Sequence, residues 1–467
     1  MTSTGPTDPP PGEILPAGFG TSTAVFVVVS SMVGVGVLTT SGFTVAAVGS
    51  NQVMLGLWAV GGMMAVCGAL AQAELSAALP RAGGDYAFLH EAYGPTVAFL
   101  SGWVSFLIGF AGPIAVAAAA SAEYLLGPLG FEPGTPRGWL VGRTLATATI
   151  LFFAGVHISG RSRTVGVQGG ITVIKIAALV LFIIAGLASG RGRVANLDDR
   201  PDFAWPLVQA CLFSLVYISY GYTGWNAASY LAAEVAEPQR RLPRAILFGT
   251  VGVTVLYLAL NLVYALALPA ADIRAIASRD GFDAVAPIAK LSAVRLFGER
   301  AAVPVSIGTG ILLWSTLSAY ILTGPRVLYA MARAGQFPAL AGRLSPRTRT
   351  PAIATAMQVG WALVLLWVGS IGDVLVYTSV GLALFSILAV AAVYILRARR
   401  PDLPRPFRVP GYPITPLGYL IPAAALTVAA FVQAPFYSGL ALASILAGVP
   451  VIRYWGVGLP VESKDHL

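Results

Sequence analysis

Two short glycine-rich stretches carry residue types suited to binding a small charged molecule through the protein backbone. The first reads SSMVGVGVLTTSGF and places Gly34 and Gly36 inside an otherwise apolar segment. Each glycine costs about 1 kcal/mol against alanine in a helix interior. Two explanations account for glycines in such a segment: close packing of the helix against a neighbouring helix, or local unwinding of the helix. Unwinding would leave N–H groups that attract a carboxylate and carbonyls that attract an ammonium.

The second stretch, SYGYTGWNAAS, covers residues 219–229 and again sets glycines inside an apolar segment. In secondary transporters, glycine-interrupted segments in corresponding positions of two halves mark the binding site. The alternative for either stretch alone is close packing of small residues between helices. Their matching positions favour unwinding. Because the two stretches are five predicted spans apart, the two five-span halves must have opposite topology.

A single charged side chain, Lys175, lies in the middle of the apolar segment GGITVIKIAALVLFIIAG. Lysine at the centre of a membrane helix costs about 3 kcal/mol on insertion scales, so its ammonium is expected to face protein or water. Snorkelling of the long side chain to the interface is the structural alternative. Two functional interpretations remain, a fixed cation or a proton carrier. No acidic residue clearly pairs with it, so backbone carbonyls are expected to accept its protons.

Composition places these stretches in an all-α polytopic membrane protein. Of 467 residues, 57% are hydrophobic and only 10% are charged, whereas soluble domains carry about 25% charged residues. Apolar runs of about 20 residues, the length that crosses a bilayer as a helix, recur along the chain. Hydropathy predicts twelve transmembrane helices at 18–46, 53–79, 96–124, 139–157, 167–189, 206–233, 244–269, 301–331, 352–370, 373–396, 415–433 and 437–455.

The short polar links between spans predict the orientation of the chain. Most of the 29 Lys and Arg residues fall in or beside the links at 80–93, 159–164, 234–244, 333–350 and 397–415. Excess positive charge marks the cytoplasmic side, so both termini are expected to be cytoplasmic. Residues 1–17 and 456–467 are read as cytoplasmic tails, the first disordered and without the features of a signal peptide. Topology explains the net charge of +9, and no nucleic-acid partner is needed.

Cysteine and histidine usage argues against metal or redox chemistry. Cys67 and Cys211 both lie within apolar spans and have no metal-ligand spacing. The three histidines are scattered, and no H-E-x-x-H motif occurs. We therefore expect no metal, no cofactor and no enzymatic activity.

Five stretches, in order along the chain, resemble amino acid permeases of the amino acid–polyamine–organocation superfamily. They are VGVGVL, ALPRAGGDYAFLHEAYGP, YTGWNAASYLAAEVAEPQRRLPRAI, ILTGPRVLYAMARAGQFP and RRPDLPRPFRVPGYPITP. The last is typical of the branch that contains the L-type and cationic amino acid transporters. The resemblance implies the inverted five-plus-five helix fold first seen in the sodium-coupled leucine transporter, with discontinuous helices 1 and 6. It divides the chain into repeat 1 at 18–190, repeat 2 at 206–397 and two additional spans at 415–455.

The resemblance also implies which residues bind the substrate. The α-carboxylate is expected at the N–H groups of Gly34, Val35 and Gly36, although Val35 stands where many relatives have Ser or Thr. The ammonium is expected at the backbone carbonyls of Met32, Tyr220 and Thr223, and Tyr222 and Trp225 are candidates for the lid. Gly221 and Gly224 belong to the second unwound segment, and Ser318 and Tyr320 are expected to face the substrate side chain. Glu74 and Glu234 lie near cytoplasmic ends of spans and are read as gate or loop anchors.

In sodium-independent relatives, a lysine of the fifth span occupies the place of a bound sodium ion. The resemblance thus implies that Lys175, with Ser315 and Thr316 as neighbours, makes transport independent of sodium.

We predict an amino acid permease of the cell membrane that moves neutral L-amino acids across the bilayer by alternating access, through exchange or uniport. The alternatives are proton-coupled symport, or a cationic amino acid or polyamine as substrate. Glu123 is the candidate residue that would attract such a positively charged substrate. A membrane enzyme or a channel is disfavoured.

Overall fold

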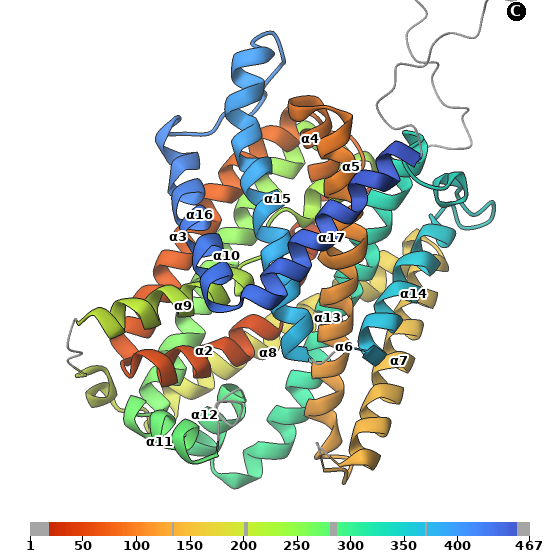
Figure 1. Ribbon diagram of the computed structural model, residues 1–467. Helices are drawn as coiled ribbons and strands as arrows, with labels where there is room; N and C mark the ends of the chain where they lie inside the picture. The colour runs from red at the N-terminus through yellow and green to blue at the C-terminus, as the bar shows by residue number, and fades with distance from the viewer. Residues whose placement is uncertain (1–17, 133–134, 200–203, 281–286, 369–370, 455–467) are drawn as a thin grey trace, which may run out of the picture.

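The computed structural model describes residues 18–132, 135–199, 204–280, 287–368 and 371–454, and within these ranges every regular element is a helix. Among the described residues, ten helical segments are long and apolar enough to cross a membrane, and two shorter apolar helices, Trp205–Gly221 and Ala352–Val368, complete a set of twelve. The predicted class, an all-α polytopic membrane protein, is confirmed. In Figure 1, α4 (Asp85–Tyr93) lies at one end of the bundle, and α11 (Ala270–Asp280) and α12 (Ile288–Phe297) lie at the other.

The uninterrupted spans begin and end within a few residues of the hydropathy prediction, although several extend further into the polar links. Their bounds are α3 Asn51–Ala78, α7 Pro136–Ile158, α8 Arg161–Ala188, α10 Pro238–Ala267, α13 Ala302–Arg333, α14 Ala352–Val368, α15 Ile371–Arg399, α16 Ile414–Gln433 and α17 Pro435–Tyr454. The third span consists of α5 (Pro95–Val104), a π-helical turn η1 (Ser105–Phe110) and α6 (Ala111–Leu126). A π turn inside a membrane helix often accompanies a functional site.

The first and the sixth spans are interrupted, as the glycine stretches predicted. The first span consists of α1 (Thr21–Met32) and α2 (Val35–Val48), separated by Val33 and Gly34. The sixth span consists of α9 (Trp205–Gly221) and the 3-10 helix η3 (Ala227–Glu234). We call residues 33–34, together with the end of α1 and the start of α2 that border them, the first break. Residues 222–226, together with the end of α9 that borders them, are the second break.

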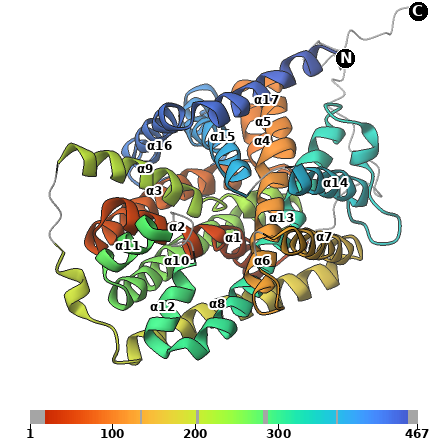
Figure 2. The same ribbon diagram turned by 60° about the horizontal axis from the view of Figure 1, so that its bottom comes forward.

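The two breaks lie against each other in the middle of the bundle. A Cβ atom on Gly36 would approach the Cα of Gly221 to 2.4 Å, closer than real Cβ contacts allow. A Cβ atom on Gly224, which has a φ of +103°, would lie 2.8 Å from the carbonyl carbon of Ser31. Glycine at these positions therefore permits backbone-to-backbone contact between the two interrupted spans. Figure 2 shows α1 near the centre of the molecule, and it contacts α10, α13 and α8.

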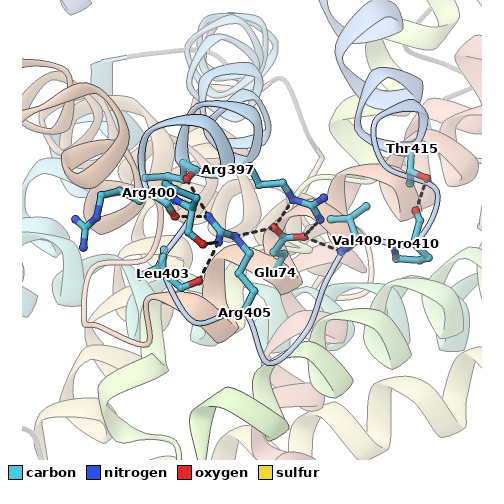
Figure 3. Close-up of polar contacts among 10 residues, drawn as sticks. Glu74, Arg397, Arg400, Leu403, Arg405, Val409, Pro410 and Thr415 are labelled. Carbon is cyan, nitrogen blue, oxygen red and sulfur yellow. Dashed lines mark hydrogen bonds and ion pairs between the residues drawn. The ribbon is translucent and has the colours of Figure 1, made fainter.

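Glu74, near the end of α3, holds the loop between α15 and α16 in place (Figure 3). Its carboxylate accepts two hydrogen bonds from Arg397, at 2.8 and 2.6 Å, and one from the backbone N–H of Val409 at 2.7 Å. Arg405 approaches the same carboxylate to 3.5 Å and donates to the carbonyls of Leu396, Arg400 and Leu403. The Glu74 carboxylate is buried, and two guanidinium groups offset the cost of removing it from water. This contact agrees with the loop-anchor interpretation of Glu74.

Glu234, at the end of η3, forms a second buried ion pair, with Arg326 of α13. The distances from its carboxylate oxygens to Nε and Nη2 of Arg326 are 2.9 and 3.3 Å. The backbone carbonyl of Glu234 also accepts from the N–H groups of Gly18 and Phe19, both at 2.8 Å. These hydrogen bonds connect the start of the first span to the end of the sixth span. The halves of the two interrupted spans that lie nearer to α4, α1 and η3, are therefore joined.

The segment 270–300, which the sequence predicts as a polar link between the spans at 244–269 and 301–331, contains the helices α11 and α12. α11 packs on α2, and α12 packs on α13 and α10. Hydropathy treats this segment as a connection between spans because it carries several charges. In the structure, the apolar face of each short helix is buried, with Ile273, Ile288 and Leu296 at most 2% exposed. Together the two helices cover the bundle at the end opposite α4.

Candidate substrate-binding site

The carbonyl groups at the end of α1 have no helical partners, and side chains from other helices satisfy them. The Val33 carbonyl accepts from the ammonium of Lys175 at 2.5 Å and from the hydroxyl of Thr316 at 2.7 Å. Lys175 also donates to the Thr316 hydroxyl at 2.7 Å and lies 3.5 Å from the Ser30 carbonyl. A helix C-terminus carries partial negative charge, so an ammonium is stabilised there. Lys175 is 1% exposed, and it faces the first break rather than snorkelling.

Hydroxyl groups surround the Lys175 site on the side towards the start of α8. The Ser30 hydroxyl lies 2.6 Å from that of Thr172 and 3.0 Å from that of Ser315. The Thr172 hydroxyl also donates to the Gln168 carbonyl at 2.6 Å. The expected neighbours Ser315 and Thr316 therefore both lie at the junction of α1, α8 and α13. Of these two residues, Thr316 is the one that contacts the ammonium.

Two tyrosines satisfy the other carbonyls at the end of α1. The Tyr320 hydroxyl donates to the Ser31 carbonyl at 3.0 Å, and the Tyr257 hydroxyl donates to the Met32 carbonyl at 2.6 Å. The Tyr257 hydroxyl also lies 3.0 Å from the carbonyl of Gly221. A side chain of α10 therefore contacts both breaks, which hydropathy and glycine patterns did not reveal.

A small cavity lies at the start of α2, where the helix presents its first N–H groups. It has a volume of about 20 Å³ and is lined by Gly34, Val35 and Gly36 together with Ser31 and Thr316. The N–H groups in the first turn of a helix have no intrahelical acceptor and attract a carboxylate. The Ser31 hydroxyl is buried and has no hydrogen-bond partner among the described residues. It supplies a polar group beside Val35, where the chain lacks a hydroxyl.

The second break satisfies most of its polar groups with its own residues. The Tyr220 carbonyl accepts from the N–H of Thr223 at 2.9 Å and from the Thr223 hydroxyl at 2.7 Å. The N–H of Tyr222 remains bonded to the Ile218 carbonyl at 3.1 Å. Among the described residues, no hydrogen bond is recorded to the carbonyl of Thr223. Of the three expected ammonium ligands, this carbonyl is therefore the most available, while those of Met32 and Tyr220 already accept one or two donors.

A larger cavity of about 100 Å³ adjoins the small one, and the two share Tyr220, Thr223 and Tyr320. Its walls come from α3, the π-helical turn η1, the second break, α15 and α16. Aromatic and aliphatic side chains dominate these walls, with Phe110 and Tyr222 among them. Over the described residues, no charged side chain lines either cavity. The combined site can hold a backbone-like charged group at the breaks and a neutral side chain in the larger cavity.

The expected lid residues Tyr222 and Trp225 belong to the walls of this larger cavity. The Tyr222 hydroxyl donates to the Trp58 carbonyl at 2.9 Å, and its ring packs 5.5 Å from that of Trp58. The Trp225 ring packs edge-on against Tyr419 of α16, with 5.7 Å between centroids. Both residues are buried.

A buried carboxylate lies behind Asn226 and Tyr230, which line the larger cavity at its α4 end. Asp85 accepts hydrogen bonds from Gln72 at 2.6 Å, Asn226 at 2.7 Å and Tyr230 at 3.0 Å. Burial raises the pKa of the Asp85 carboxyl, and the hydrogen bonds from Gln72, Tyr230 and Asn226 act to lower it. Because Asn226 and Tyr230 also line the cavity, this network holds the inner segment of the sixth span against α3 and α4.

Ser318 does not lie where the substrate side chain was expected to contact it. Its hydroxyl is 2.9 Å from Nε2 of His157 in α7, and it lines neither cavity. Thr316 and Tyr320 are four residues apart on α13 and share the face towards the breaks. A residue midway between them points to the other side of the helix. Helical periodicity therefore explains why Ser318 packs against α7.

Comparison with known protein families agrees with this architecture. A family model described as amino acid permease matches residues 19–450, which covers nearly the whole chain. The chain belongs to this amino acid permease family. The permease is therefore a multi-pass membrane transporter and not an enzyme, as the sequence predicted.

Several curated relatives are similar to the permease over most of their length. It is 28% identical to the large neutral amino acids transporter small subunit 2 of Homo sapiens, over 95% of this chain and 82% of that one. It is 28% identical to the serine/threonine exchanger SteT of Bacillus subtilis, over 93% of this chain and 95% of that one. The Asc-type amino acid transporter 1 of Mus musculus is likewise 28% identical, over 92% and 80%.

Sequence reasoning missed three contributors to this site: Tyr257, the Ser31 hydroxyl and the π-helical turn with Phe110. Ser31 lies directly before Met32, so the glycine pattern contained the signal that would have placed it at the first break. Tyr257 carries no such signal because an aromatic residue in an apolar helix more often packs in the core. The π-helical turn has no recognisable sequence pattern in SFLIGF.

Proposed function

We propose that the permease exchanges neutral L-amino acids across the cell membrane without coupling to sodium. The substrate α-carboxylate binds the N–H groups at the start of α2, through Gly34, Val35 and Gly36. The ammonium binds carbonyls of the two breaks, those of Met32 and Thr223. The side chain occupies the larger cavity, beside Tyr320 and the lid residues Tyr222 and Trp225. The two charged groups of the amino acid thereby meet helix ends of opposite partial charge.

The observation that carries sodium independence is the position of the Lys175 ammonium. It lies between the Val33 carbonyl and the Thr316 hydroxyl, where a positive charge joins the end of α1 to α13. A metal cation would use the same oxygen ligands. A fixed ammonium supplies the charge permanently, so the first break keeps its shape without a bound ion. Its two short oxygen contacts, at 2.5 and 2.7 Å, also favour a fixed cation over a proton carrier, since deprotonation would remove a donor.

Two further observations support neutral substrates and exchange. Cavity walls without charged side chains favour an uncharged substrate side chain, because a buried ion needs a partner. The curated relatives carry names that refer to large neutral amino acids and to serine/threonine exchange. The uncharged side chains that these names refer to are compatible with the walls of the larger cavity.

We also propose that the α4 end of the bundle faces the cytoplasm and that residues 18–190 and 206–397 form two inverted repeats. The positive charges of the α4-end links support this orientation. Single cysteines at the exposed positions Arg240 and Arg347 are expected to react with a membrane-impermeant reagent only from inside, and one at exposed Arg193 only from outside. The reverse pattern would overturn the orientation.

Reconstituted transport tests the function directly. Purified permease in liposomes is loaded with an unlabelled neutral amino acid, and uptake of labelled L-leucine, L-serine, L-lysine and L-glutamate is measured with and without sodium. We expect uptake of the neutral substrates to depend on internal amino acid and to be equal in sodium and choline. Sodium-stimulated uptake would contradict the assignment to Lys175. Stimulation by an inward proton gradient would favour symport.

A further inference from the structure

We propose that the hydroxyl of Tyr257 links the two breaks and redirects its O–H hydrogen bond from the Met32 carbonyl to the Gly221 carbonyl when a substrate binds. This inference rests on the proposed binding of the substrate ammonium at the Met32 carbonyl. Tyr257 lies on α10, outside both interrupted spans, and its side chain is fully buried. It is a positioning residue that acts through the backbone of the two breaks.

The Tyr257 hydroxyl has one proton to donate and two carbonyl acceptors within reach. The Tyr257 hydroxyl lies 2.6 Å from the Met32 carbonyl and 3.0 Å from the Gly221 carbonyl. Each of these carbonyls is the last of its helix, at the ends of α1 and α9, so neither has a helical donor. Within the described residues, Tyr257 is the recorded donor to both. One hydroxyl carries one proton, so two buried acceptors share a single donor.

An ammonium that approaches the Met32 carbonyl corrects this shortage. It brings three N–H donors, and a charged donor forms the stronger hydrogen bond. The Tyr257 proton is then free to bond fully to Gly221, 3.0 Å away, without any movement of the ring. Occupation of the first break thereby strengthens the end of α9 at the second break. The coupling needs no contact between the substrate and Gly221.

The aromatic packing around Tyr257 keeps its hydroxyl in this bridging position. Its ring lies 5.3 Å from Trp58 in an edge-on arrangement and 5.1 Å from Tyr222. The Tyr222 hydroxyl is bonded to the Trp58 carbonyl. A phenylalanine at position 257 would keep these ring contacts and lose only the hydroxyl. Tyr257→Phe is therefore expected to fold.

Tyr264 offers a matched control on the same helix. It is also a buried tyrosine, at 1% exposure, but its hydroxyl has no hydrogen-bond partner among the described residues. Tyr264→Phe removes the same atom from the same helix and leaves both breaks intact. Any effect of Tyr257→Phe that Tyr264→Phe lacks belongs to the link between the breaks.

Hydrogen exchange of the full-length protein, without substrate, tests the link. In Tyr257→Phe we expect amides at both breaks, those of Val33 and Tyr222 among them, to exchange faster. The expected factor is roughly tenfold, which corresponds to the loss of one hydrogen bond to a buried group. Tyr264→Phe should match the wild type. Acceleration at one break alone, or at neither, would overturn the proposal.

Hydrogen exchange in saturating L-leucine or L-serine tests whether the Tyr257 hydrogen bond moves to the Gly221 carbonyl. The wild type is expected to become protected at both breaks, whereas Tyr257→Phe should become protected at the first break only. Equal protection of both breaks in the variant would overturn the coupling. A wild type that shows no protection at either break would instead contradict the proposed binding site, and the substrate-free measurement would still decide whether Tyr257 links the breaks.

Transport kinetics give a second readout. Turnover of Tyr257→Phe is expected to fall about tenfold, because the two interrupted spans no longer respond together, while that of Tyr264→Phe stays at the wild-type value. Turnover and KM equal to those of Tyr264→Phe would contradict a role in transport.

Discussion

The two interrupted spans reach a similar geometry by different means. At the first break, the carbonyls of α1 are satisfied by side chains from distant helices, namely Lys175, Thr316 and Tyr257. At the second break, most hydrogen bonds connect residues within five positions of each other, such as Thr223 with Tyr220. The first break is therefore held by tertiary contacts, and the second is held mainly by local turns.

This difference indicates which break is the more sensitive to substitution. A buried carbonyl that loses its donor has no water to replace it, so each tertiary donor at the first break matters. A local turn retains its backbone hydrogen bond when a side chain is removed. We therefore expect large effects from substitutions around the first break and small effects within the second.

The largest effect is expected where the two interrupted spans touch. Gly36→Leu would place a Cβ 2.4 Å from the Cα of Gly221, and backbone cannot yield as a flexible side chain can. We expect transport to be abolished while the protein still inserts into the membrane. Gly56→Leu, at an exposed position of α3 where no atom lies within 4 Å, is the control and should remain active. Near-normal uptake by Gly36→Leu would show that the spans do not pack in this way during transport.

The next largest effect is expected from the ammonium at the first break. Lys175→Ala removes a charged donor to the Val33 carbonyl and to Thr316. Charged hydrogen bonds of this kind contribute about 1.5–3 kcal/mol, so transport should fall roughly 100-fold. Lys175→Arg should restore little transport, because the planar guanidinium group does not fit the compact site of an ammonium. Lys290→Ala, an exposed position on α12, provides the matched control, and equal uptake in the two alanine variants would refute the fixed-cation role.

A smaller effect is expected from the hydroxyl that accompanies the ammonium. Thr316→Val keeps the shape of the side chain but removes the donor to Val33 and the acceptor for Lys175. We expect about a tenfold loss of kcat/KM. Thr316→Ser retains the hydroxyl and should stay close to wild type. If both variants behave alike, the hydroxyl does not support the first break.

The smallest effect is expected at the second break. Thr223→Val removes the side-chain hydrogen bond to the Tyr220 carbonyl but leaves the backbone bond between the same residues. Uptake should change by no more than about threefold, because one neutral hydrogen bond is lost and its acceptor keeps a donor. A loss as large as that of Thr316→Val would remove the distinction between the two breaks.

Much of the fold could be predicted from the sequence because a membrane constrains it strongly. Backbone polar groups must be satisfied within each segment, so apolar runs of sufficient length become helices. Glycines inside such runs predicted both interruptions, and the isolated charge of Lys175 predicted a buried partner. The helices α11 and α12 were not predicted, since their polar faces make them look like connecting loops to a hydropathy average.

The site was predicted less completely. Glycine positions and the family resemblance placed Gly34, Gly36 and Thr223 at the breaks. They gave no account of which carbonyl would remain available, because this depends on donors that other helices supply. Ser318 shows the same limit, since proximity along α13 suggested a substrate contact and the rotation of the helix directs it to His157.

By itself, the sequence determined that two helices break and that one lysine is buried, because glycine and charge have fixed energetic costs inside an apolar helix. Tertiary structure decided how the breaks meet and what satisfies them. Tyr257 is an ordinary aromatic residue of α10 in the sequence, and only the packing of α10 against α1 brings its hydroxyl between Met32 and Gly221. Hydrogen bonds between distant segments depend on the rotation and spacing of whole helices, which local residue patterns do not specify.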